Sequence, residues 1–160
     1  MSISLTGSEL INIALGIEKE GIAFYDTMAR STLNGATRDL FQSLAEMERE
    51  HVKIFQGMLA EADKALIMET YSGELAAYIQ SLVDSAVFTD ELVTSEMVAR
   101  AGSDIEAMEL AISAEKDSIL FYYDMKEMMP QRAQLMVAKI IAEEKSHLRQ
   151  LSEQKKKLSD

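Results

Sequence analysis

The sequence predicts an all-α protein, a four-helix bundle of two repeated helical hairpins joined by a long crossover with short helices. Three observations lead to this fold class. Four long segments place apolar residues at the 3.6-residue period of a helix, and none alternates as a strand would. Only one proline and seven glycines interrupt the 160 residues, and the second half repeats motifs of the first. We expect one domain over residues 1–160, a length that can bury a core.

The first hairpin is expected over residues 6–64. Its first helix begins at the capping box Thr6-Gly7-Ser8-Glu9 and runs to about Ser31. The inner face of this helix carries Ile11, Leu15, Glu18, Ile22, Tyr25 and Ala29. Asn34-Gly35 makes a turn, and so short a connection indicates an antiparallel neighbour. The second helix, from about Ala36 to Lys64, has the inner face Leu40, Leu44, Glu48, His51, Phe55 and Met58.

Residues 65–102 are expected to form the crossover. Tyr71-Ser72-Gly73 interrupts the helical pattern, Glu74 to Val87 is amphipathic, and Thr94 to Arg100 adds a helical turn or two. These 38 residues far exceed the length of a tight turn. Such a length lets the two hairpins pair within one chain or swap between chains.

The second hairpin is expected over residues 103–158 and begins at a second capping box, Ser103-Asp104-Ile105-Glu106. The inner face of its first helix, which ends at Met129, carries Met108, Ile112, Glu115, Ile119, Tyr122 and Met125. Pro130 suits the first turn of the next helix. The inner face of that last helix carries Ala133, Val137, Ile140, Glu144, His147 and Leu151.

An internal repeat relates the two hairpins. Glu18 to Tyr25, EKEGIAFY, matches Glu115 to Tyr122, EKDSILFY, at an offset of 97 residues. The Glu-x-x-His pair of the second helix recurs in the fourth at an offset of 96 residues. Each capping box begins 12 residues before the glutamate of its own helix. The chain therefore contains two versions of one helical hairpin.

Composition excludes several classes of function. Acidic residues outnumber basic ones 27 to 16, a net charge of −11, which argues against a nucleic-acid-binding protein. The absence of cysteine excludes disulfides, thiolate metal sites and cysteine-ligated iron–sulfur clusters. We find neither a signal-peptide pattern nor an apolar run long enough to cross a membrane, and therefore expect a cytoplasmic protein.

Each inner face is apolar except at one level, where a glutamate or a Glu-x-x-His pair stands. At about 1.5 Å per residue, the chain returns to nearly the same height on either side of each hairpin turn. Residues at i and i+3 also share a helix face. We therefore expect six side chains to converge midway along the bundle: Glu18, Glu48, His51, Glu115, Glu144 and His147.

This set of side chains favours a metal site. Buried carboxylates destabilise a core unless they are paired, protonated or bound to a cation. Four carboxylates and two imidazoles suit a pair of divalent ions, and carboxylate di-iron and di-manganese bundles use such a set. We predict two iron ions, although manganese or zinc also suits these ligands. The alternative is a set of buried ion pairs in a purely structural bundle.

Other polar residues near the expected site have alternative roles. Tyr25 and Tyr122 lie two turns beyond a glutamate of their own helix, so they either pack in the core or act beside the metals. Four glutamates close to the expected ligands should be solvated: Glu20, Glu46, Glu50 and Glu143. Glu46 or Glu143 could instead line an access route.

These motifs resemble the ferritin-like superfamily, and most closely its rubrerythrin branch, over roughly residues 6–155. The resemblance rests on the two Glu-x6-Tyr segments, the two Glu-x-x-His pairs and the long crossover. It implies a ferritin-like four-helix bundle with a non-haem di-iron centre that reacts with peroxide or dioxygen. It also implies that Glu18 and Glu115 are terminal ligands and that Glu48 and Glu144 bridge. His51 and His147 would then each bind one metal.

Two departures from rubrerythrins matter. Rubrerythrins usually carry a four-cysteine rubredoxin module, whereas this chain has no cysteine, so an external rubredoxin-like electron donor is expected. They also carry an extra glutamate three residues after the ligand of the third helix, where this chain has Ser118. The remaining set equally resembles the ferroxidase centre of bacterioferritins. The long crossover and the lack of a clear fifth helix after the bundle fit storage cages poorly.

Three functions follow from this interpretation. The leading one is an oxidoreductase, expected to be a homodimer, that reduces hydrogen peroxide or dioxygen at a di-iron centre. The second is a ferroxidase that serves iron storage or delivery. The third is a metal-binding bundle without enzymatic activity.

Overall fold

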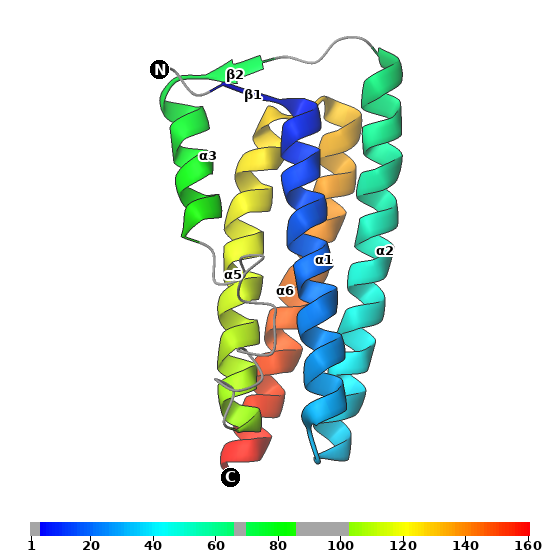
Figure 1. Cartoon of the computed structure of the whole chain (residues 1–160), viewed down its shortest axis with the longest axis vertical. Helices are drawn as coiled ribbons and strands as arrows, with labels where there is room; N and C mark the ends of the chain where they lie inside the picture. Colours follow the sequence, from blue (N-terminus) through cyan, green and yellow to red (C-terminus); the bar gives the residue numbers. More distant parts are fainter. Residues whose placement is uncertain (1–3, 66–69, 86–102) are drawn as a thin grey trace.

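Four long helices form an antiparallel bundle, as the hydrophobic periodicity predicts (Figure 1). The computed structural model describes residues 4–65, 70–85 and 103–160. The long helices of these segments are α1 (Gly7–Ser31), α2 (Gly35–Ala65), α5 (Asp104–Met128) and α6 (Gln131–Ser159). The predicted all-α fold class and both predicted hairpins are confirmed.

The predicted signals begin three of these helices. At the start of α1 the Thr6 amide donates to Glu9 Oε2 at 2.6 Å, and the Glu9 amide donates to Thr6 Oγ1 at 3.1 Å, so the capping box is complete. Ser103 Oγ accepts from the amide of Glu106 at the start of α5. Asn34 Oδ1 accepts from the Thr37 amide at 2.9 Å, so the residue predicted as a turn also caps α2.

Two boundaries differ slightly from the sequence prediction. Pro130 has an extended backbone, with ψ 152°, and stands just before α6 instead of within its first turn. α3 (Glu74–Asp84) ends three residues short of Val87, the predicted end of the amphipathic segment. The turn predicted over residues 94–100 lies outside the described residues.

A short antiparallel strand pair, which the sequence did not predict, joins the N-terminus to the crossover. β1 (Ser4–Thr6) pairs with β2 (Thr70–Ser72), with Leu5 opposite Tyr71. Three-residue strands are too short to establish an alternating pattern, which is why this segment was visible only as a break in helical periodicity. Gly73, with φ 80° and ψ −142°, takes a positive-φ conformation that glycine tolerates and that leads from β2 into α3.

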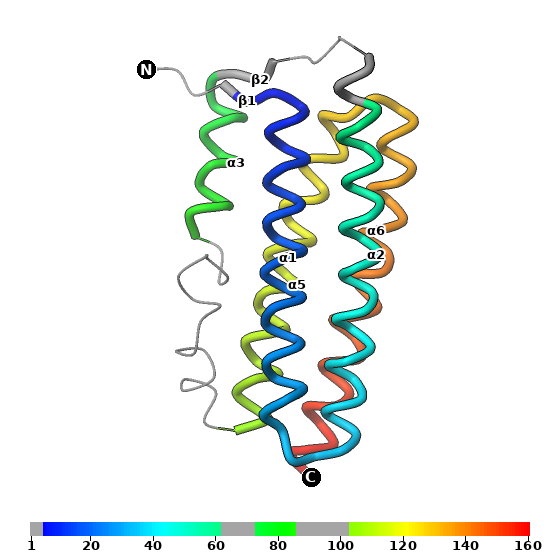
Figure 2. Tube along the Cα trace, turned by 45° about the vertical axis from the view of Figure 1, so that its right-hand side comes forward, coloured from blue at the N-terminus to red at the C-terminus, as the bar shows by residue number. Residues whose placement is uncertain are grey.

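The two hairpins lie against each other so that α1 contacts α5 and α2 contacts α6 (Figure 2). In this structure they pair within one chain. α3 packs against α5 and buries Ala76 and Ile79. Within the described residues, no helix combines the length and the apolar character needed to cross a membrane.

Two apolar clusters fill the bundle on either side of a polar layer. The cluster nearer the strands includes Leu10, Ile11, Phe55, Met125 and Ile140. The cluster nearer the α1–α2 turn includes Phe24, Met28, Phe41, Met108 and Leu151. Along α1, Glu18 stands between residues of the two clusters, so the apolar core isolates this layer from water at both ends.

Candidate metal centre

All six side chains predicted to converge do meet in the polar layer, and each residue is at most 3% exposed. α1 and α5 each contribute one glutamate, and α2 and α6 each contribute a glutamate and a histidine. The side chains form two groups of four, and the ligand atoms within each group lie within 4.8 Å of one another. The groups are Glu18, Glu48, His51, Glu144 and Glu48, Glu115, Glu144, His147.

The composition of the two groups reveals how they could hold a pair of ions. Glu48 and Glu144 belong to both groups, whereas the other two glutamates and the two histidines belong to one group each. Two neighbouring ions at these positions would therefore share two carboxylates. Each ion would also contact one further carboxylate and one imidazole. The geometry thus accommodates two metals in close proximity.

The imidazoles turn the same nitrogen toward the carboxylates. His51 Nδ1 lies 3.0 Å from Glu48 Oε2, 3.3 Å from Glu18 Oε2 and 3.0 Å from Glu144 Oε1. His147 Nδ1 lies 3.0 Å from Glu144 Oε2, 3.4 Å from Glu48 Oε1 and 3.7 Å from Glu115 Oε1. A single N–H cannot serve three carboxylates at once, whereas a cation can.

Electrostatics show how the site compensates for its buried charge without metal. Burial, then the charge of a neighbouring glutamate, raises the pKa of Glu18 and of Glu115 well above the usual value. Burial alone would lower the pKa of both imidazoles. Hydrogen bonds to the surrounding carboxylates outweigh it, raising the pKa of His51 and bringing that of His147 to about 12. Protons therefore occupy the site in the absence of cations.

The same contacts act on the two shared glutamates in the opposite direction. Burial raises the pKa of Glu48 and of Glu144, but polar contacts that include those with both histidines lower each pKa below its usual value. Despite these contacts, Glu144 Oε1 is buried and has no hydrogen bond of acceptable geometry in the described residues. Oxygen-rich, strongly anionic surroundings with an unsatisfied carboxylate oxygen fit divalent cations.

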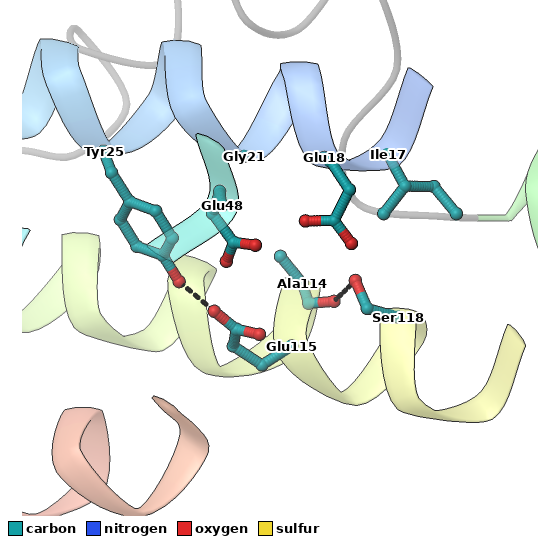
Figure 3. Close-up of a pocket in the computed structure, with 8 residues that line it drawn as sticks. All are labelled: Ile17, Glu18, Gly21, Tyr25, Glu48, Ala114, Glu115 and Ser118. Carbon is teal, nitrogen blue, oxygen red and sulfur yellow. Dashed lines mark hydrogen bonds between the residues drawn. The ribbon is translucent and has the colours of Figure 1, made fainter. Parts of the chain in front are cut away.

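The two tyrosines connect the hairpins through the candidate ligands. The Tyr25 hydroxyl donates to Glu115 Oε1, and the Tyr122 hydroxyl donates to Glu18 Oε1 (Figure 3 for Tyr25). Each tyrosine therefore contacts the glutamate of the opposite hairpin. The glutamate on its own helix lies two turns away, about 10 Å along the axis, and is too distant. Burial is the main cause that raises the pKa of both phenols, so they stay protonated donors.

Glu143 is a functional candidate that the sequence prediction placed on the solvated surface. Its Oε2 atom lies 2.7 Å from His51 Nε2, the ring nitrogen that points away from the other glutamates, and its side chain is 30% exposed. One residue along a helix turns a side chain by about 100°, so the neighbour of Glu144 projects toward α2. This direction is the feature of the sequence from which a contact between Glu143 and α2 could have been predicted. Glu46, by contrast, is exposed and pairs with Arg49 at 3.4 Å.

A small pocket reaches the layer between α1 and α5 (Figure 3). Its lining is Ile17, Glu18, Gly21, Tyr25, Glu48, Ala114, Glu115 and Ser118. The interior has room for about one water molecule. Ile17 and Ser118 are half-buried, whereas the glutamates are buried, so the pocket runs inward from these two residues.

Ser118 and Gly21 occupy equivalent positions of the repeat and keep this pocket open. Ser118 Oγ donates to the backbone carbonyl of Ala114 at 3.0 Å, so the position of the extra rubrerythrin glutamate supplies no carboxylate here. A Cβ atom at Gly21 would lie 3.6 Å from Glu48 Cγ, an ordinary contact distance. Small side chains at both positions therefore leave the pocket unfilled beside the buried glutamates.

Comparisons with known proteins agree with this site. The family model described as Rubrerythrin matches residues 9–155. A crystal structure from Thermotoga maritima, described as that of a ferritin-like diiron-carboxylate protein, is 33% identical, with a TM-score of 0.76 and 95% of each chain covered. A DUF305 fragment from Deinococcus radiodurans shares the fold at 14% identity, with a TM-score of 0.65, covering 94% of this chain and 95% of that one. No curated protein gives a significant match.

The family match and the site describe the same part of the chain. The matched residues 9–155 include all four long helices in large part and all six clustered side chains. The similar Thermotoga maritima structure extends over nearly the whole of both chains. The chain is therefore a helical bundle of the ferritin-like type and belongs to the rubrerythrin family.

Proposed function

We propose that this protein reduces hydrogen peroxide or dioxygen to water at a pair of iron ions in the polar layer. The observation that carries the proposal is the pair of four-residue groups that share Glu48 and Glu144 inside a dry core. In this proposal Glu18 and His51 would hold one ion and Glu115 and His147 would hold the other. Glu48 and Glu144, which belong to both groups, would be shared between the two ions. The chemistry that a bound iron pair supplies is two-electron transfer to the O–O bond.

The residues around the layer favour a small substrate. The pocket between α1 and α5 leads to Glu18, Glu48 and Glu115 and is narrow, which suits a molecule of two to four atoms. The apolar clusters above and below keep bulk water away from the reacting groups. Peroxide reduction takes up two electrons and two protons and yields two molecules of water. Reduction of dioxygen to two molecules of water takes up four electrons and four protons, so the external donor would supply the second pair of electrons. Those protons would reach the site by the same pocket.

The two tyrosines would keep the carboxylates of Glu18 and Glu115 in place. The Tyr122 hydroxyl holds Glu18 Oε1, while Glu18 Oε2 lies 3.3 Å from His51 Nδ1. The Tyr25 hydroxyl holds Glu115 Oε1, the oxygen that lies 3.7 Å from His147 Nδ1. Because both phenols remain protonated, they act as donors at every pH near neutrality. We therefore assign Tyr25 and Tyr122 a positioning role beside the metals.

Electrons would come from a separate protein. These 160 residues contain no cysteine, so they offer no rubredoxin-type iron site. A rubredoxin-like donor that docks near the polar layer would supply one electron at a time to the iron pair. The donor would be a one-electron carrier of low reduction potential.

The proposal is tested by loading the protein with Fe(II) without oxygen and mixing it rapidly with peroxide or with dioxygen. We expect two irons per chain and rapid oxidation by at least one of these oxidants, followed by absorbance. Slow oxidation with both oxidants, or fewer than two irons per chain, would contradict the proposal.

A ferroxidase serving iron storage is the second candidate, favoured by the lack of a seventh ligand at Ser118. It predicts a large hollow oligomer and many more than two irons per chain. Light scattering together with metal analysis distinguishes the two functions. A small oligomer that stops at two irons supports the oxidoreductase.

A further inference from the structure

The two buried histidines differ at the nitrogen that points away from the other candidate ligands. His51 Nε2 lies 2.7 Å from Glu143 Oε2, a carboxylate of the other hairpin. His147 Nε2 is equally buried and has no hydrogen-bond partner among the described residues. Both histidines present Nδ1 to the shared glutamates, so the contrast is confined to their outer nitrogens.

The internal repeat explains this contrast. Glu143 stands one residue before Glu144, and the residue one before Glu48 is Met47. One hairpin therefore has a carboxylate at the position where the other has a thioether. A thioether sulfur is only a weak acceptor. The difference in side-chain type between the two hairpins is therefore encoded in the sequence.

Metal binding at Nδ1 would make the outer nitrogen decisive. An ion on Nδ1 takes its lone pair, so the remaining imidazole proton sits on Nε2 and needs an acceptor. Glu143 supplies that acceptor for His51. At His147 the same proton would be buried without a partner, which destabilises the bound state.

We propose that Glu143 is a positioning residue that makes the two metal positions unequal, so that the position at His51 binds a divalent ion first and more tightly. The inference rests on the proposed metal site. Glu143 lies at the α2–α6 side of the layer and does not line the pocket between α1 and α5. It therefore acts through His51 and has no contact with substrate. Carboxylates that orient a ligating histidine typically change metal affinity about 10–100-fold.

Calorimetric and optical titration with Co(II) alone tests the inference in two backgrounds. With His147→Ala only the His51 position keeps its imidazole, and Glu143→Ala should weaken Co(II) binding about 10-fold or more. With His51→Ala only the other position remains, and Glu143→Ala should leave the affinity unchanged. Glu143→Gln keeps a neutral acceptor and should recover part of the loss. Glu46→Ala removes an exposed glutamate of equal charge and should have no effect in either background.

A spectroscopic measurement on otherwise unaltered protein supports the titration if a histidine variant folds poorly. In protein labelled with ¹⁵N-histidine and loaded with Zn(II), the His51 Nε2 proton should be protected from exchange and shifted downfield. Glu143→Ala should remove both features and leave the His147 signals in place. Circular dichroism of each variant shows whether the bundle is intact.

The outcomes separate this inference from the proposed function. The inference is overturned if Glu143→Ala weakens Co(II) binding equally in both backgrounds, or does not weaken it in the His147→Ala background. In either case, two Co(II) ions bound per wild-type chain would still support the metal site. If the wild-type chain binds no Co(II), the proposed function fails and the inference falls with it.

Discussion

The two hairpins supply the same ligand types from the same helical positions, yet their surroundings differ. Where α1–α2 has Gly21 and Met47, α5–α6 has Ser118 and Glu143. The equivalent residues Gly21 and Ser118 both line the pocket and both have small side chains. The equivalent residues Met47 and Glu143 differ, and His51 Nε2 has a carboxylate partner whereas His147 Nε2 has none among the described residues. A repeated motif can therefore create a symmetric ligand set with two unequal halves.

The largest effect on metal binding is expected from a substitution that removes a ligand from both metal positions. Glu48 belongs to both four-residue groups, so Glu48→Ala removes a carboxylate from each metal position. We expect Co(II) affinity to fall more than about 100-fold, beyond the effect of losing a residue that only orients a ligand. Iron content after loading should reach background, as measured by metal analysis. Glu46→Ala, on the same helix but exposed, is the matched control, and two irons per chain in Glu48→Ala would contradict the shared role.

Removing the metals should reverse the pH dependence of stability. Raised pKa values of His51 and His147 stabilise the metal-free fold below the unfolded value of about 6.5, and this contribution is lost as pH rises toward about 12 for His147. The raised pKa values of Glu18 and Glu115 act in the same direction from their lower unfolded values. Bound cations replace these protons, so metal affinity rises with pH.

Thermal unfolding between about pH 6 and pH 9 measures this reversal. With chelator, the Tm should decrease as pH rises. With excess Co(II), the Tm should increase, and a ligand at 1,000 times its Kd stabilises by about 4 kcal/mol. Parallel trends in the two series would show that metal and protons do not compete for the site.

The tyrosine hydrogen bonds are equivalent in the two hairpins, so substitution of each tyrosine tests whether the hairpins also contribute equally to stability. Tyr25→Phe and Tyr122→Phe each remove one buried donor to the opposite hairpin's glutamate. Each change should destabilise the metal-free protein by about 1–3 kcal/mol because a buried acceptor loses its partner. Urea unfolding should give similar values for the two variants. A loss confined to one variant would show that the tyrosine contacts also differ between the hairpins.

The pocket can be narrowed without altering a proposed ligand. Ser118→Leu places a large side chain at the half-buried position beside Ala114, whereas Ser118→Ala does not. Ser118→Leu should slow oxidation of the Fe(II)-loaded protein by peroxide several-fold and leave Co(II) affinity unchanged. Stopped-flow absorbance and calorimetry measure the two quantities. An unchanged rate would indicate that oxidants reach the layer by another route.

The sequence predicted the parts of this molecule that follow from periodicity and repetition. The helices and their caps are local features, and Glu18 and Glu48 stand out because a carboxylate interrupts an otherwise apolar face. Similar distances from the turns then placed the carboxylates at nearly one level. The β1–β2 pair was missed because three residues on each strand carry no measurable period.

Contacts between helices were harder to predict than the helices themselves. The partner of Tyr25 is Glu115, which depends on how α1 packs against α5 and not on spacing along one helix. The role of Glu143 depends on the α2–α6 contact in the same way. Comparison of the two repeats could have identified it, because Met47 at the equivalent position marks a difference beside otherwise matching ligands.

The smallest expected effect is a gain that makes the two halves alike. Met47→Glu places a carboxylate at the position of α2 that corresponds to Glu143 of α6, where it should give His147 Nε2 an acceptor. The second Co(II) ion should then bind a few-fold more tightly, with the first unchanged, because part of the roughly 10-fold benefit goes to ordering the new side chain. Met47→Gln, a neutral acceptor of similar size, should give a smaller gain, and Met47→Leu should give none.

Calorimetry in the His51→Ala background isolates the His147 position. Tighter binding with Met47→Leu as well would trace the gain to packing, and the asymmetry would then arise from the helix contact instead of from Glu143.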